Sequence, residues 1–257
     1  MKLQDSLIMD YQLNHNEIIF MRKLGKIAAT FLRRLRKIIR ANLTTKDIEG
    51  MFDDYLRRNK RVESAFLGYN GYPASLCVSV NEEVIHGIPN KNKVIKNGDI
   101  VSVDLGLKSK GLFVDCAYTY RIGKVSLAAE KLIKTGMRAL KAGIKNARIN
   151  NRVGDISSAV QKTSESNGYA VIRKFVGHGI GKTLHCYPEV PNFGNSGNGP
   201  VLQEGMVLAI EPMIASGSFD VETSPDGWTV KTQDNSLSCH FEHTVAITKR
   251  GPWILTN

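Results

Sequence analysis

The chain has 257 residues, of which 42% are hydrophobic and 23% charged, an ordinary composition for a globular protein. A chain of this length buries roughly 70–75% of the surface that it exposes when unfolded, so it needs neither disulfides nor a structural metal for stability. Its 35 lysine and arginine residues exceed its 24 acidic residues, and the formal net charge of +11 suits either RNA and the ribosome or a generically basic enzyme.

Two amphipathic helices are predicted at the start of the chain. Residues 16–40 carry apolar side chains at helical spacing, with basic residues around most of the remaining surface. Such a helix either binds a membrane or an acidic partner, or packs on its own domain as a surface helix. Thr44 and Asp47 form a capping-box pattern, which opens a second helix whose apolar stripe begins at Ile48.

The predicted elements then alternate between blocks of strands and a second pair of helices. Strand-like runs in residues 74–121 are SLCVSV, DIVSVDLGL and LFVDCAYTY. From residue 126 the helical period returns, with Gly143 expected as a C-cap, and a further helix runs from about Asp155 to Asn167-Gly168. The last strand-like runs are AVIRKFV, MVLAIEP, GWTVKT and SLSCHFEHTVAIT.

The order of elements is therefore two helices and then strands, given twice, without a residue-level repeat. Separate blocks of helices and antiparallel strands indicate an α+β architecture, in which helices cover one face of a sheet. We expect the strands of the two halves to come together, and a functional site to lie in the cleft between them.

No feature of the sequence indicates secretion or a membrane. The four cysteines are scattered without a Cys-x-x-Cys pair, which favours reduced thiols. The N-terminal residues lack the apolar core of a signal peptide, and no run approaches the ~18 apolar residues of a membrane span. We therefore expect a cytoplasmic protein that does not associate with membranes.

Two aspartates occupy a predicted hairpin. If the turn lies at Ser109-Lys110, then Asp104 and Asp115 stand opposite one another, with Cβ atoms roughly 4.5–5.5 Å apart. Gly111 indicates a bulge that could shift this register. Two facing carboxylates cost about 4 kcal/mol at ~4 Å with an effective dielectric near ~20, and a cation between them removes the cost. The alternative is a pair of strand-end acids in solvent.

A glycine-rich segment surrounds one histidine. In Gly177-His178-Gly179-Ile180-Gly181 the spacing is not that of a dinucleotide-binding loop, and no helix is predicted after it. The flanking glycines are expected to leave His178 accessible at a strand end, and His185 follows shortly after. A histidine in either position alone is more often structural than functional.

Two glutamates lie in apolar strand-like runs. Glu211 ends the run MVLAI before Pro212, and Glu242 is predicted in the middle of a strand. An unpaired buried carboxylate is very unfavourable, so a mid-strand glutamate needs either solvent or a cation. Each residue taken alone is also explained as a surface acid.

Together these side chains form a candidate metal site of four carboxylates and one imidazole: Asp104, Asp115, His178, Glu211 and Glu242. Oxygen ligands with one imidazole suit Mn, Fe or Co and admit Zn. Two divalent ions neutralise four carboxylates and lower the pKa of a bound water from about 15.7 toward ~7. The reaction class indicated is metal-assisted hydrolysis.

Six segments resemble motifs of the type I methionine aminopeptidases: NEEVIHGIP (81–89), NGDIVSVDLGL (97–107), GLFVDCAYT (111–119), GHGIGKTLHCYPEVP (177–191), EGMVLAIEPM (204–213) and SLSCHFEHT (236–244). The resemblance runs from about residue 12 to residue 250 and covers all five metal-ligand positions. It implies the pita-bread fold, a single catalytic domain over 1–257 with two pseudo-symmetric ααββ halves and a central antiparallel sheet covered by helices. The halves would span about 13–122 and 126–250, after a short N-terminal extension (1–12).

The resemblance further implies an exopeptidase that removes the N-terminal methionine from nascent proteins and prefers a small second residue. Its cofactors would be two divalent metal ions per chain (Co, Mn, Fe or Zn), which hold the attacking hydroxide. Asp104 would chelate one ion, His178 and Glu211 would hold the other, and Asp115 and Glu242 would bridge both.

By the same resemblance, His86 would contact the substrate near the scissile amide. His185 would donate to the substrate carbonyl or its developing oxyanion, and Glu211 would shuttle a proton. Apolar walls suit a flexible thioether. The residues expected to line the pocket for the methionine side chain are Tyr69, Tyr72, Cys77 and Trp228; for Tyr72 and Trp228 ordinary core packing is the alternative.

Four positions depart from the family pattern. Lys182 and Leu184 stand where Arg and Phe are more frequent, Cys186 replaces an acid, and His240 replaces Gln two residues before Glu242. None of these changes removes a ligand. They can alter the pocket or the metal preference, because partners of the ligands change metal affinity by about 10–100-fold.

Two other readings of the sequence are open. A proline-directed peptidase of the same fold usually carries an extra N-terminal domain, for which this chain has no room. A non-enzymatic relative that binds the ribosome or RNA typically loses metal ligands, and none is lost here. The expected partners are the N-terminal peptides of nascent proteins, with ribosome association through the basic surface, and the chain is expected to be a monomer.

Overall fold

The computed structural model describes residues 11–257, so most of the expected N-terminal extension, residues 1–12, lies outside the described part. The first two described helices are α2 (His15–Ile38) and α3 (Thr45–Arg58), as the periodicity predicts. Each begins at a capping box, in which the side chains of Asn14 and Glu17, or of Thr44 and Asp47, bond to each other's backbone N–H groups. Reciprocal capping satisfies donors that the first helical turn leaves unpaired, which fixes both starting points.

The first block of strands is organised around β4. Its elements are β1 (Glu63–Ser64), a short 3₁₀ helix at Tyr69–Gly71, β2 (Cys77–Val80), β3 (Glu83–Ile85), β4 (Ile100–Ser109) and β5 (Leu112–Arg121). β4 pairs with β5 along one edge and with β1 and β2 along the other, all antiparallel. The apolar stripe of α2 packs on β4 and β5, and the Tyr120 hydroxyl donates to the Leu32 carbonyl at 2.8 Å.

The second pair of helices is α4 (Leu127–Asn146) and α5 (Val153–Glu165). The expectation of a C-cap at Gly143 is wrong, because α4 continues past it. A Cβ atom on Gly143 would lie 2.9 Å from Cγ2 of Val160. This glycine therefore allows α4 and α5 to approach closely. The end of α5 is close to the predicted place, and Gly168 follows it with a φ of +80°.

The remaining strands form a five-stranded antiparallel sheet and two smaller ones. They are β6 (Ala170–Val171), β7 (Gly177–Gly179), β8 (Cys186–Val190), β9 (Val207–Ile210), β10 (Met213–Ala215), β11 (Val221–Thr223), β12 (Val230–Thr232), β13 (Ser238–His240), β14 (His243–Thr248) and β15 (Gly251–Ile254). The large sheet has the order β15-β14-β9-β7-β8, while β13-β10-β6 and β11-β12-β3 form the others. The last of these sheets includes β3 from the first block of strands.

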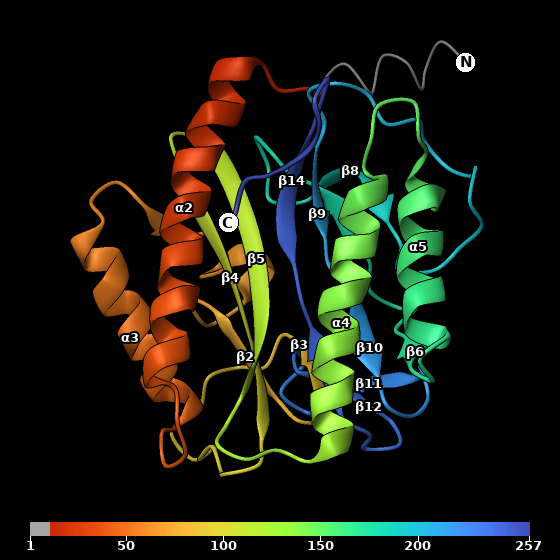
Figure 1. The fold of residues 1–257 in the computed structure, drawn as a ribbon. Helices are drawn as coiled ribbons and strands as arrows, with labels where there is room; N and C mark the ends of the chain where they lie inside the picture. The colour runs from red at the N-terminus through yellow and green to blue at the C-terminus, as the bar shows by residue number, and fades with distance from the viewer. Residues whose placement is uncertain (1–10) are drawn as a thin grey trace.

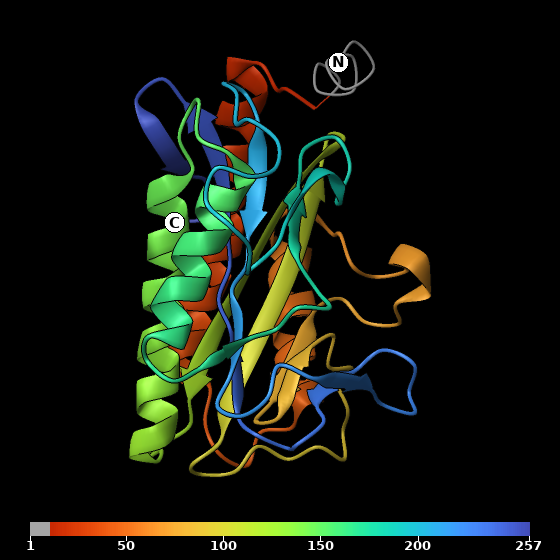
Figure 2. The same ribbon diagram turned by 90° about the vertical axis from the view of Figure 1, so that its right-hand side faces the viewer.

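The helices lie along one side of the strands, as predicted for an α+β architecture. Figure 1 shows α2 beside β4 and β5, with α3 on the other side of α2, and α4 beside β9 and β14, with α5 on the other side of α4. In the turned view of Figure 2, α2, α4 and α5 stand together on one side, with most of the strands on the other. One hydrophobic cluster lies between the first helices and strands, and a second between α4, α5 and the later strands.

Two threonines join β5 to the segment that contains β13 and β14. The Thr244 hydroxyl donates to the Asp115 carbonyl (2.7 Å) and accepts from the Asp115 N–H (2.9 Å). Thr119 makes the same reciprocal pair with the backbone of His240, at 2.7 and 3.0 Å. Between them, the Glu242 N–H donates to the Ala117 carbonyl at 3.0 Å. These bonds place Asp115 beside Glu242, residues that are far apart in the sequence.

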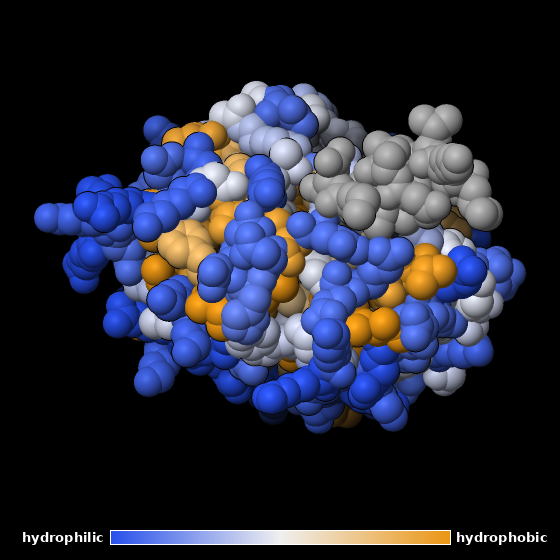
Figure 3. Space-filling view, turned by 90° about the horizontal axis from the view of Figure 1, so that it is seen from above, coloured by the Kyte–Doolittle hydropathy of each residue, from blue (hydrophilic) through white to orange (hydrophobic). Residues whose placement is uncertain are grey.

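Within residues 11–257, no helix is both long and apolar enough to cross a membrane. Figure 3 looks down on the end of the molecule at which α2 begins. Hydrophilic side chains cover most of the coloured part of this face, and hydrophobic ones lie between them in small groups.

Candidate active site

Asp104 and Asp115 lie on the same face of the β4–β5 hairpin, but not opposite one another. Ser109 pairs with Leu112, so the turn is Lys110-Gly111, and Asp115 stands opposite Gly106. The predicted direct pairing is wrong by a shift of two residues. The register is set by the turn. A two-residue hairpin turn requires positive φ at both positions, and Lys110 (49°) and Gly111 (73°) adopt it. The two aspartates are diagonal neighbours, which keeps their side chains within reach of one another.

Glu211 and Glu242 both lie at points where the chain leaves a strand. Glu211 follows β9 and precedes Pro212, as predicted. The prediction that Glu242 lies in mid-strand is wrong, because residues 241–242 separate β13 from β14. Here the chain exchanges its pairing with β10 for pairing with β9, and the Phe241 N–H donates to the Pro212 carbonyl at 3.2 Å. The break between β9 and β10 therefore lies beside the break between β13 and β14, and each break carries one of the two glutamates.

His178 lies in the middle of β7 and is buried, so the expectation of an accessible strand end is wrong. Its flanking glycines have a different role. A Cβ atom on Gly177 would lie 2.4 Å from the Ala209 carbonyl oxygen, and one on Gly179 would lie 2.3 Å from that of Tyr187. Glycine is thus required for β8 and β9 to approach β7 on both sides.

The imidazole of His178 is oriented for ligation through Nε2. Its Nδ1 lies 2.9 Å from the Gly179 carbonyl oxygen, an acceptor, so Nδ1 carries the proton. Nε2 then has its lone pair free, and it lies 3.5 Å from Oε1 of Glu211. A backbone carbonyl that fixes the tautomer of a histidine in this way is typical of metal ligands.

The five candidate ligands meet in one small cavity of about 80 Å³. One ligand atom from each of Asp115, His178 and Glu242 lies within 4.8 Å of the others. Asp104 and Glu211 line the same cavity. No lysine or arginine of the described residues lines it, so no protein cation balances the four carboxyl groups there.

Burial raises the pKa of every carboxyl group in this cavity, and repulsion from neighbouring carboxylates raises three of the four further. Burial is the larger cause, and it raises the pKa of Asp104 to about 7. Burial together with neighbouring carboxylates holds the pKa values of Asp115, Glu211 and Glu242 well above their usual range. An oxygen of Asp104, of Asp115 and of Glu242 is buried without a hydrogen-bond partner. Buried, unpaired oxygens beside a histidine lone pair are a donor set that fits divalent cations.

The other predicted residues line the same cavity. The His185 ring lies 4.2 Å from that of His178, centroid to centroid, and its Nδ1 is 2.8 Å from the Tyr69 hydroxyl. Tyr72 meets Trp228 edge to face at 5.1 Å. These aromatic side chains form a second part of the cavity lining, the aromatic side. The lining also includes Cys77, His86 and Leu184.

Phe66 is a lining residue that the sequence analysis missed. It lies in the loop after β1, and its ring would clash with any side chain at Gly106, where a Cβ atom would lie 2.6 Å from Cε1 of Phe66. No periodicity or motif marks this position. A glycine inside the strand DIVSVDLGL was the available signal, since glycine in a strand often marks a close approach.

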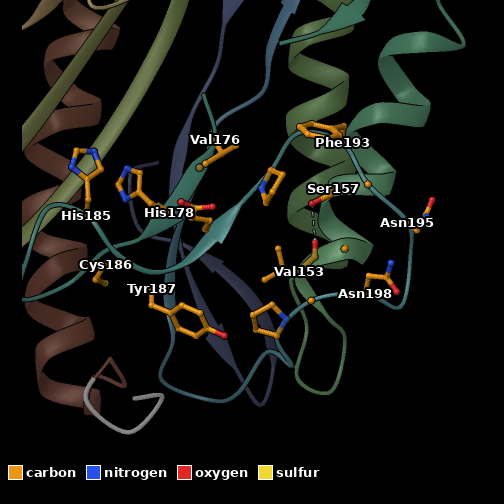
Figure 4. A pocket seen from close by; sticks show the side chains of 17 residues that line it. Val153, Ser157, Val176, His178, His185, Cys186, Tyr187, Phe193, Asn195 and Asn198 are labelled. Atoms are coloured by element: carbon orange, nitrogen blue, oxygen red, sulfur yellow. Dashed lines mark hydrogen bonds between the residues drawn. The ribbon is translucent and has the colours of Figure 1, made fainter. Parts of the chain in front are cut away.

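A larger groove of about 850 Å³ adjoins the cavity and shares His178 and His185 with it. Figure 4 shows these two histidines at one end, with Phe193 and Asn198 at the other. Its walls are β8, the loop 191–200 and the start of α5. The carboxylates therefore lie in the smaller cavity. The groove extends from this cavity toward the surface.

Residues 20–249 match metallopeptidase family M24. A methionine aminopeptidase of Clostridium acetobutylicum is 49% identical over 243 residues, which cover 95% of this chain and 97% of the relative. Methionine aminopeptidase 1 of Bacillus subtilis is 42% identical, over 93% of this chain and 96% of the relative.

Solved structures agree with these matches. The methionine aminopeptidase of Thermotoga maritima superposes with a TM-score of 0.93 at 46% identity, covering 95% of this chain and 98% of that one. The prolidase of Pyrococcus furiosus has a TM-score of 0.80 at 20% identity, over 99% of this chain and 67% of that one, which shows a shared fold alone. The predicted pita-bread fold is confirmed, and the chain belongs to metallopeptidase family M24, among the methionine aminopeptidases.

Proposed function

We propose that this chain removes the N-terminal methionine from proteins and peptides as a metal-dependent exopeptidase. The prediction of a methionine aminopeptidase agrees with relatives that are 42–49% identical over nearly the whole chain. The observation that carries the proposal is the convergence of four buried carboxyl groups and the Nε2 of His178 beside an aromatic pocket. This combination provides a site for hydrolytic metals and a site for an apolar side chain within one cavity.

We assign two divalent ions (Co, Mn, Fe or Zn) to the cavity. Asp104 would hold one ion, His178 and Glu211 the other, and Asp115 and Glu242 both. The support is charge, since two divalent ions balance four carboxylates that are otherwise buried without a counter-ion. When bound, such ions supply Lewis acidity and a water of low pKa.

His185 is assigned the role of hydrogen-bond donor to the substrate carbonyl. If the Tyr69 hydroxyl donates to Nδ1, then Nε2 carries the proton and is the donor that remains. Burial lowers the pKa of His185, which keeps the ring neutral at pH 7. A fixed neutral donor of this kind stabilises negative charge that develops on the carbonyl oxygen.

We assign to His86 a contact with the substrate near the scissile amide, and to Glu211 the transfer of a proton. His86 lines the cavity with a φ of +59°, a conformation that is unusual for a residue other than glycine. Burial lowers its pKa to about 4, so it acts as a neutral donor or acceptor. Glu211 has the raised pKa and the position beside His178 that a proton carrier needs.

The methionine side chain would occupy the pocket formed by Tyr69, Tyr72, Cys77 and Trp228, with Phe66 as an additional wall. The aromatic rings offer polarizable surface, with which a thioether interacts favourably. The Tyr72 hydroxyl is near the carbonyl oxygens of Leu76 and Gly87, at 3.3 and 3.2 Å, so the ring can face the pocket without an unpaired hydroxyl. The small volume favours a short second residue in the substrate.

The rest of the substrate chain would leave through the groove that shares His178 and His185 with the cavity.

We also propose that residues 13–122 and 126–250 are the two pseudo-symmetric halves of one catalytic domain, in a cytoplasmic monomer. Ribosome association would use the exposed basic residues of α2, such as Arg33, Arg36 and Lys37. Binding to ribosomes that weakens as the salt concentration rises would support this partner.

The deciding experiment is an assay of the purified chain after it is loaded with each divalent ion. We expect release of methionine from Met-Ala-Ser and no cleavage of Xaa-Pro peptides. A reversed preference would assign the chain to proline-directed peptidases of the same fold. The absence of hydrolysis with every metal, together with tight RNA binding, would favour a non-enzymatic role.

A further inference from the structure

His240 belongs to the site region but has no role in the assignments above. Its side chain has 2% of its surface exposed, in strand β13. Its Nε2 atom is buried without a hydrogen-bond partner. Buried polar atoms are nearly always paired, so an unpaired ring nitrogen beside a reactive centre requires an explanation.

The nearest charged group to this nitrogen is the Glu211 carboxylate. Nε2 of His240 lies 3.7 Å from Oε2 of Glu211, slightly beyond hydrogen-bond distance. On the other side, Nε2 of His178 lies 3.5 Å from Oε1 of the same carboxylate. Glu211 therefore lies between two imidazoles, and each of them faces a different oxygen.

The position of His240 is set by the backbone around it. Its N–H donates to the Thr119 hydroxyl, which in turn donates to its carbonyl, and the residue pairs with Met213 in the β10–β13 ladder. These bonds fix the backbone of His240, and the buried ring has little room to rotate away from Glu211. The Glu211 side chain lies just beyond the end of β9, outside its hydrogen-bonded ladder. A small rotation of that side chain would bring Oε2 within bonding distance.

We propose that His240 is a positioning residue for Glu211: its Nε2–H donates to Oε2 and thereby aims Oε1 toward the ion that His178 holds. The inference rests on the proposed function, since it assigns a partner to one proposed metal ligand. His240 does not line the cavity, so it acts through Glu211 and not on the substrate. Hydrogen bonds that orient a ligating carboxylate change metal affinity by about 10–100-fold.

The test compares two substitutions of His240 with a control on the same strand. H240L removes the donor at similar volume, and H240Q retains an N–H donor of similar reach. C239A is the control, because Cys239 is buried in the same strand, faces the second hydrophobic cluster and points away from Glu211. The probe is Co²⁺ alone. Its dissociation constants are measured by calorimetry and its coordination by visible absorption, and kcat and KM for Met-Ala-Ser are measured separately.

For H240L we expect an affinity loss of about tenfold or more for one Co²⁺, an altered absorption band, and a lower kcat with KM nearly unchanged. H240Q should recover most of the affinity and the band, and C239A should resemble the unchanged chain. Wild-type affinity and spectrum in H240L would overturn the inference. So would an H240Q variant as impaired as H240L, because ring packing or direct ligation would then be the cause.

If H240L does not fold, H240N replaces it, because its amide donor is too short to reach Glu211 and the same loss is expected. Circular dichroism of each variant verifies the fold before titration. Failure of the proposed function has a different signature, in which the unchanged chain binds Co²⁺ but releases no methionine. The Co²⁺ titrations still decide the role of His240 in that case.

Discussion

The cavity has a carboxylate side and an aromatic side, which differ in how their polar groups are satisfied. On the carboxylate side, buried oxygens of Asp104, Asp115 and Glu242 have no partner, and repulsion is added to burial. On the aromatic side, His185 bonds to Tyr69 and the Tyr72 hydroxyl is near two carbonyl oxygens. The carboxylate side is therefore incomplete without cations, whereas the aromatic side is complete as it stands. Removing a carboxylate should therefore stabilise the metal-free protein, whereas a substitution on the aromatic side should leave its stability nearly unchanged.

The largest expected effect comes from the carboxylate side. E242Q should lower kcat/KM by about 10³-fold or more, since loss of the proposed metal ligand would remove several kcal/mol of metal-based stabilisation. The same change should raise the melting temperature of the metal-free protein, because it removes a carboxyl group that folding must either bury as a charge or protonate, beside Asp115 and Glu211. Steady-state kinetics and thermal melts in chelator measure both. A metal-free protein that is destabilised by E242Q would show that the carboxylate is already satisfied.

The second prediction concerns pH. The folded pKa of Asp104 is about 7, above its unfolded value near ~3.9, so folding favours the protonated form. The stability from this group is fully present below pH ~4 and is lost as pH rises through 7, by as much as about 4 kcal/mol. Metal-free protein should therefore melt at lower temperature at pH 7.5 than at pH 5. D104N should flatten this slope.

Metal loading should reverse that trend, because ligands must be deprotonated to bind. Thermal melts in the presence of Mn²⁺ should show stability that rises from pH 5 to pH 7.5. Parallel slopes with and without the ion would contradict the idea that the carboxylate side is incomplete.

The two sides also differ in how well the sequence predicted them. Strand alternation placed Asp104 and Asp115 on one face, and this survived the error in register, because a shift of two residues keeps every side chain on its face. The register depended on which pair of residues could adopt a turn with positive φ, and Lys110 gave no sign of it. The helices were predicted well, because their stripes and capping boxes are local signals.

Other features of the site depend on contacts between distant segments. Glu242 leaves its strand because β13 and β14 pair with different neighbours and because its N–H bonds to Ala117, which no local pattern encodes. The burial of His178 likewise follows from strands that close on it from both sides. Phe66 reaches the cavity from a loop without periodicity. Sequence motifs thus identified the chemical groups, whereas tertiary pairing determined their surroundings.

A smaller effect is expected on the aromatic side. Y69F removes the hydroxyl that bonds to Nδ1 of His185, and a net hydrogen bond contributes about 0.5–1.5 kcal/mol. We expect kcat to fall by about 2–10-fold, with the melting temperature of the metal-free protein nearly unchanged. Kinetics and melts of Y69F measure this, with Y169F as the control, because Tyr169 is partly exposed and lines neither the cavity nor the groove. A loss as large as that of E242Q would mean that Tyr69 belongs functionally to the carboxylate side.

The smallest expected effect concerns the groove, which belongs to neither side. If the substrate chain leaves past His185 toward Phe193, then peptides longer than three residues should bind there and bury additional apolar surface. A gain of about 1 kcal/mol would lower KM roughly fivefold between Met-Ala-Ser and a hexapeptide that begins with the same residues. F193A should abolish this gain while leaving the kinetics of Met-Ala-Ser unchanged, because the tripeptide ends before Phe193. Equal KM values for both peptides in the unchanged chain would show that the substrate takes another path out of the cavity.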